Sequence, residues 1–101
     1  MDPELPDIMI SDVVSSAAGR DQGKLFYVID LDADYLILAN GKDRTLDKPK
    51  RKKRKHVQKV LRPETRVAGK IKNGDKVLNS ELRRDLAYFG RAMQGNDLGG
   101  F

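Results

Sequence analysis

Short runs of β-branched and aromatic residues, separated by turn residues, fill the chain from residue 13 to residue 39. This pattern is typical of closely spaced antiparallel strands. It predicts strands at residues 12–18, 24–31, 35–39 and, after a charged interval, 56–61. Strands this short and this numerous favour a small barrel over a sandwich, so we expect a mainly β fold.

The residues between these runs carry turn signals of their own. Gly19 and Gly23 supply the positive φ that a tight loop or a bulge needs, and Asn40-Gly41 is a strong hairpin signal. We therefore interpret Gly19, Gly23 and Gly41 as residues that the backbone geometry of these loops requires. A phosphate could still approach closely over a loop without bulky side chains.

Beyond Pro63 the apolar spacing lengthens to a helical period, with buried-type residues at Val67, Ile71, Leu82, Leu86 and Phe89. It predicts a pair of short helices near residues 64–73 and 80–93. A glycine at 74 suits a C-terminal cap, and an asparagine at 79 suits an N-cap. The tail, residues 94–101, has three glycines and no apolar period, so we expect it to be disordered. Residues 1–12 contain four carboxylates and no cation, which predicts a flexible acidic leader.

One interval sets the electrostatic character of the chain. Residues 48–55, the basic segment, read Lys-Pro-Lys-Arg-Lys-Lys-Arg-Lys and include no carboxylate. The net charge of +5 is local, because the rest of the chain carries thirteen cations against fifteen carboxylates. A dense cationic strip on a nearly neutral body predicts a polyanion as partner, since neutralised phosphates release condensed counterions and drive association.

Several function classes find no support in the composition. The chain has no cysteine and one histidine, so it offers neither a disulfide framework nor a zinc ligand set. Asp30, Asp32 and Asp34 mimic the start of a calcium loop, but Tyr35 and Gly41 occupy the positions that require glycine and glutamate. No nucleophile and base form a recognisable constellation. We therefore expect a non-enzymatic protein without a metal or cofactor.

Three stretches in order resemble a known family. Residues 13–24 read Val-Val-Ser-Ser-Ala-Ala-Gly-Arg-Asp-Gln-Gly-Lys, and Asn40-Gly41-Lys42-Asp43-Arg44 and the basic segment with His56-Val57 follow. The first stretch resembles the KOW motif of ribosomal proteins and NusG-type transcription factors. The full pattern is similar to bacterial KOW-domain RNA-binding proteins akin to an archaeal and eukaryotic large-subunit ribosomal protein. The resemblance implies an SH3-like barrel over residues 13–62, with the basic segment as a loop, a helical extension over 63–93, and RNA binding.

These expectations converge on a set of candidate RNA-binding residues. They are Arg20, Lys24, Arg44, Lys48, Lys50, Arg51, Lys52, Lys53, Arg54, Lys55 and His56. With many cations and few aromatic residues, we expect readout of RNA backbone and shape, with a role in translation if the RNA is ribosomal and the partner is the large subunit. Arg44 could instead pair with Asp43 or Asp47, His56 could simply pack, and Tyr27 and Tyr35 suit a half-buried core better than base stacking.

Other interpretations of the basic segment remain open. It could be a solvated, disordered loop, a nuclear-localisation signal, or a surface for an acidic protein on a barrel that serves as an interaction module. The acidic leader could also fold over it and screen it. No apolar run reaches the length of a membrane span, and the acidic N-terminus is unlike a secretory signal, so we expect a cytoplasmic protein that contacts no membrane and is monomeric when free.

Overall fold

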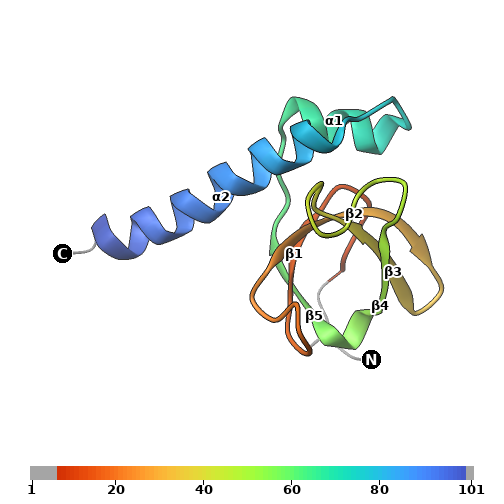
Figure 1. Cartoon of the computed structure of the whole chain (residues 1–101), viewed down its shortest axis with the longest axis horizontal. Helices are drawn as coiled ribbons and strands as arrows, with labels where there is room; N and C mark the ends of the chain where they lie inside the picture. Colours follow the sequence, from red (N-terminus) through yellow and green to blue (C-terminus); the bar gives the residue numbers. More distant parts are fainter. Residues whose placement is uncertain (1–6, 100–101) are drawn as a thin grey trace.

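The computed structural model describes residues 7–99, with side-chain environments for residues 7–93, and its centre is a five-stranded antiparallel sheet (Figure 1). The strands are β1 (Val13–Ser16), β2 (Leu25–Asp32), β3 (Tyr35–Ala39), β4 (Lys50–Lys53) and β5 (Val57–Leu61). Their order across the sheet is β4-β3-β2-β1-β5. The strand predicted at residues 35–39 is confirmed. The other three predicted strands differ from the observed ones by one or two residues at one end or at both ends.

The basic segment is not a loop, which corrects the expectation. Residues Lys50–Lys53 form edge strand β4, paired with β3, and Arg54–His56 form the 3-10 helix η1. The β3 backbone supplies hydrogen-bond partners along the whole length of β4, and this pairing overrides the low strand propensity of lysine and arginine. Because β4 and β5 lie at opposite edges and are joined only through η1, the sheet curls strongly, as Figure 1 shows, and stays open between them.

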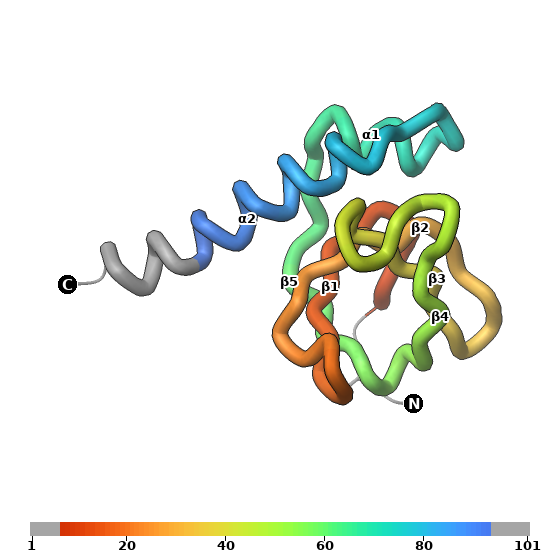
Figure 2. The backbone as a smooth tube through the Cα atoms, viewed as in Figure 1, coloured from red at the N-terminus to blue at the C-terminus, as the bar shows by residue number. Residues whose placement is uncertain are grey.

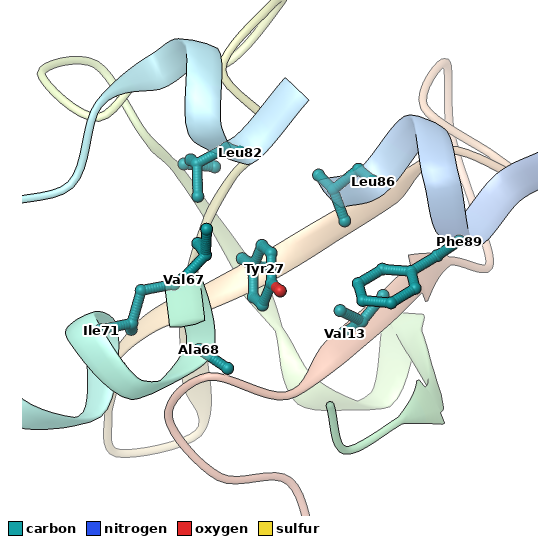
Figure 3. Close-up of a cluster of buried hydrophobic side chains, with 9 residues drawn as sticks. Val13, Tyr27, Val67, Ala68, Ile71, Leu82, Leu86 and Phe89 are labelled. Carbon is teal, nitrogen blue, oxygen red and sulfur yellow. The ribbon is translucent and has the colours of Figure 1, made fainter. Parts of the chain in front are cut away.

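Each face of the sheet packs against its own hydrophobic cluster. The concave face holds Phe26, Val28, Leu36 and Leu38 with Val14, Val57 and Ile8. The opposite face presents Val13, Tyr27 and Ala39 to the helices, and Figure 3 shows this second cluster with Leu82, Leu86 and Phe89 directed toward Tyr27. The two-residue period of a strand explains the division, since alternate side chains point to opposite faces.

Two helices follow the sheet, as predicted, and cover one end of its outer face (Figure 2). Helix α1 (Arg66–Asn73) begins at the N-cap Thr65, whose Oγ1 accepts the N–H of Ala68, and ends at Gly74 with φ of 76°. Pro63 therefore precedes the helix instead of lying in its first turn. The Gly74 cap confirms the expectation, because glycine adopts this left-handed conformation without a Cβ penalty.

Helix α2 (Asn79–Gly99) is longer than the predicted short helix, and it continues into residues 94–99, which were expected to be disordered. Extending an existing helix adds one hydrogen bond per residue, whereas starting one is costly, so glycines near the end need not stop it. Asn79 is not the N-cap, because its Oδ1 accepts the N–H of Leu46 at 2.8 Å. Glu81 instead closes the first turn by accepting the Leu78 N–H at 2.9 Å.

The second half of the predicted flexible leader is packed, which corrects that expectation for residues 7–12. Ile8 is 4% exposed and joins the concave cluster, and Asp12 is fully buried. Asp12 accepts a hydrogen bond from Arg62 Nε at 2.8 Å and one from the Met9 N–H at 2.8 Å. Residues 1–6 and 100–101 lie outside the described part of the chain.

Candidate nucleic-acid interface

The side chains of β4 alternate between two environments. Lys50 pairs with Leu38 and Lys52 with Leu36, while Arg51 pairs with Ile37 and Lys53 with Tyr35. Residues directly opposite each other in a sheet share a face. Lys50 and Lys52 therefore lie on the face of the buried leucines, and Arg51 and Lys53 lie on the outer face. The cations of the basic segment do not form one continuous strip.

The two inward lysines hold the glycine loop, residues 17–24, against the sheet. Lys50 Nζ lies 2.9 Å from Asp21 Oδ2, and Lys52 Nζ donates to the Ala18 carbonyl at 2.9 Å. On the other side, the Ala17 N–H donates at 2.8 Å to the carbonyl of His56, at the end of η1. The loop thus bridges the open side of the sheet. The lysine side chains of β4 contact it on one side, and its backbone contacts η1 on the other.

Asp21 is the acidic anchor of this arrangement. The hydrogen bond from Lys50 lowers the pKa of the Asp21 carboxyl; burial opposes this effect, and the positive charges of Lys50, Arg44 and Lys24 reinforce it. Sequence reasoning did not assign Asp21 a role, because nothing near it in the chain indicates that a lysine from β4 is its partner. The predicted backbone role of the loop glycines agrees with φ of 82° at Gly19 and 88° at Gly23.

On the outer face Arg51 lies over the ring of Tyr35. Its guanidinium carbon is 3.9 Å from the ring centroid, and Lys53 Nζ is 5.9 Å from the same centroid. Arg51 Nη2 also donates to Asp32 Oδ2 at 3.0 Å. Tyr35 is half-buried, as expected. The Arg51 contact was not anticipated from the sequence.

Four candidate cations keep exposed side chains and have no ion pair among residues 7–93. They are Arg20 in the glycine loop, Lys48 before β4, Lys53 on β4 and Lys55 in η1. His56 beside Lys55 is exposed as well. The contact between the glycine loop and η1 brings two of these groups, Arg20 and Lys55, onto neighbouring segments of the same side of the sheet.

The remaining candidates have partners within the protein. Lys24 Nζ lies 2.5 Å from Asp43 Oδ2, so Asp43 is not the partner of Arg44. The Arg44 N–H donates to Asn40 Oδ1 at 2.9 Å, and its half-buried side chain adds positive charge near Asp21. Arg54 donates to the Ile8 carbonyl at 2.9 Å and so holds the N-terminal segment. Lys24 and Arg54 thus support the surface through side-chain contacts, whereas Arg44 is held through its backbone.

Tyr27 belongs to the core, as its strand position suggested. Its ring is fully buried, and its hydroxyl donates to Asp85 Oδ2 at 2.7 Å. Burial comes first among the causes that raise the pKa of Tyr27, followed by the charge and hydrogen bond of Asp85, although the Thr65 hydroxyl opposes them. The same carboxylate accepts from Thr65, so one group joins β2, α1 and α2.

Within residues 7–99 no three side chains of the metal-binding types lie close enough to hold an ion. None of the described helices is both long and apolar enough to cross a membrane. A groove of about 550 Å³ lies between the 40–43 turn and α2, away from β4, and is lined by Leu25, Leu86 and Ala87 together with charged groups. No protein-family model matches the sequence, and no curated protein matches it either.

Proposed function

We propose that this chain is a non-enzymatic RNA-binding protein whose curled sheet is an SH3-like barrel of the KOW type. It binds structured RNA, ribosomal RNA in particular, by its phosphate backbone. The observation that carries the proposal is the group of four exposed cations without carboxylate partners among residues 7–93, which lie on β4, just before it, on η1 and in the glycine loop. Uncompensated cations held on ordered backbone favour a polyanion, because counterion release adds to each contact.

In this proposal some cations contact RNA directly, and others hold the surface in position. Arg20, Lys48, Lys53 and Lys55 contact phosphates, and exposed His56 adds a possible stacking partner for a base. Lys50 and Lys52 hold the glycine loop in place, so they act on RNA through its position. Backbone contacts carry no sequence information, so we expect weak sequence preference.

The first test is RNA binding as a function of salt. If about five phosphates are neutralised, log K against log salt should have a slope of about −3.5 to −4.5. K48Q/K53Q/K55Q should reduce the size of that slope by about 2 to 3 and weaken binding about tenfold or more. The matched control R66Q/K72Q/K76Q removes three exposed cations from the helical side and should bind nearly as wild type.

A slope near zero, or equal losses in the two triple variants, would reject this electrostatic interface. Circular dichroism on both variants establishes that each is folded. The altered side chains are exposed and unpaired among residues 7–93, so neither triple variant should unfold.

The ribosomal part of the proposal has a separate test. Lysate from cells that produce the protein is sedimented through sucrose at physiological salt, with and without ribonuclease, and the protein is followed by antibody. Co-migration with the large subunit, lost after nuclease or at high salt, is the expected result for a cytoplasmic protein of translation. Migration at the top of the gradient in every sample would reject the ribosome as its partner.

An acidic protein surface is the second candidate partner, because unpaired cations fit any polyanion. The groove beside α2, with its apolar lining, offers additional protein-binding surface. Nuclease treatment separates the two candidates. Only the RNA model predicts that association with the partner disappears when RNA is digested.

A further inference from the structure

We infer that the outer face of β3 and β4 carries a stacking site for one unpaired RNA base, formed by Arg51 on Tyr35. This inference rests on the proposed function and adds the kind of RNA that the surface prefers. The RNA would be a helix interrupted by a bulge or loop, in which a base is free to leave the stack.

The register of three strands builds the site. Asp32 pairs with Tyr35 across β2 and β3, and Tyr35 pairs with Lys53 across β3 and β4. These three side chains therefore form a row on the outer face. Arg51 is the diagonal neighbour of Tyr35 and lies over its ring at 3.9 Å. The helices pack on this face against Val13, Tyr27 and Ala39, and the Arg51 and Asp32 side chains remain open to solvent.

The state of the Arg51 guanidinium favours a base over a phosphate. One of its N–H edges is engaged by Asp32 at 3.0 Å, and the carboxylate offsets its charge. A phosphate bound to that edge would have to displace Asp32. The flat face directed away from Tyr35 remains accessible, since the Arg51 side chain is 55% exposed. Bases stack on guanidinium planes, and the aromatic ring beneath holds this plane in position.

Lys53 completes the site. Its ammonium group lies 5.9 Å from the Tyr35 centroid and has no ion pair among residues 7–93, so it is available to the phosphate next to the stacked base. The guanidinium plane of Arg51, whose charge Asp32 partly neutralises, thus lies beside the ammonium group of Lys53. A paired base cannot use the plane, because the faces of bases in an A-form helix are stacked on their neighbours.

The test compares two RNA hairpins of equal length, one fully paired and one with a single bulged 2-aminopurine. The wild-type protein should bind the bulged hairpin about fivefold or more tightly, and stacking should quench the 2-aminopurine fluorescence. R51K keeps the charge but removes the plane. It should bring the ratio of affinities close to one and leave the salt slope unchanged. The matched control R66K makes the same exchange at an exposed arginine of the helical side, which has no cation–π contact among residues 7–93, and should keep the ratio.

The outcomes separate this inference from the function on which it rests. Equal binding of both hairpins by wild type, with no effect of R51K, overturns the stacking site and leaves the phosphate interface standing. A preference that R51K and R66K reduce equally also overturns it. Absence of binding to either hairpin overturns the RNA proposal itself, and the stacking site with it.

Discussion

Gly41, in the turn after β3, lies directly against the first residue of α2. Its φ is 78°, and a Cβ built on it would overlap with the Asn79 carbonyl, next to the Arg83 side chain. We expect G41A to lower the free energy of unfolding by about 2 kcal/mol or more, since strain adds to the overlap. G23A, with similar φ but open space, should lose only about 1 to 2 kcal/mol. Urea denaturation of both variants measures the difference; equal losses would show that the close approach has no energetic effect.

Asp12 makes the stability of the protein depend on pH. Burial by itself raises the pKa of the Asp12 carboxyl, but hydrogen bonds from Arg62 and the Met9 N–H, with the charges of Arg62 and Lys59, outweigh it and leave the pKa lowered. A lowered pKa in the folded state stabilises the protein above about pH 4, the unfolded value, and this contribution is lost as pH falls through the folded value.

The corresponding variant is D12N. It should cost about 1.5 to 3 kcal/mol at pH 7, because a charge-assisted hydrogen bond in a buried site is weakened. The difference from wild type should shrink as the pH is lowered below about 4. Denaturation at a series of pH values checks this, and a difference that is constant between pH 7 and pH 2 would contradict it.

At the scale of elements, alternate residues of β4 have different roles. The inward lysines hold the glycine loop, and the outward cations face the solvent. K50Q/K52Q should release the glycine loop and lower the free energy of unfolding by about 1 kcal/mol, since an ion pair and a hydrogen bond to the loop are lost. K53Q/K55Q removes equal charge from exposed positions and should leave stability nearly unchanged while weakening RNA binding. Chemical denaturation and RNA titration of both pairs provide the comparison. Equal effects on stability would show that the alternation has no consequence.

The elements differ in how far the sequence predicts them. β3 was predicted at its observed bounds because it is a continuous run of apolar and aromatic residues, which suits a strand whose two faces both pack against other side chains. β4 was not predicted as a strand because a run of lysine and arginine has no apolar period, and only pairing with β3 orders it. The candidate cations were found by charge alone. Their division into paired and free groups depends on Asp21 and Asp32. Asp21 reaches β4 through the curl of the sheet, and Asp32 reaches it through the register of β2, β3 and β4.

At the scale of the whole molecule, the acidic leader bears on the proposed RNA-binding surface. Arg54 of η1 donates to the Ile8 carbonyl, and Asp2 and Glu4 precede Ile8 in the sequence. D2N/E4Q raises the net charge from +5 to +7 without touching buried Ile8 or Asp12. If the leader screens the interface, binding to RNA should tighten about twofold at low salt and less at high salt.

The same titration decides whether the leader has this effect. Unchanged affinity at every salt concentration would remove the screening model and leave the phosphate contacts as they are. Deleting residues 1–12, by contrast, would remove Ile8 from the concave cluster and Asp12 from Arg62, so a loss of binding by that deletion would report unfolding.

The alternation along β4 also bears on how such a protein diversifies. Positions 51 and 53 face outward, whereas positions 50 and 52 secure the loop. Every second residue of this edge strand can therefore change without affecting folding. Selection for a new ligand can act on these residues. Lineages that share this architecture should keep lysine at the inward positions and differ most at the outward ones, and a randomised library at those outward sites should yield folded variants with new binding preferences.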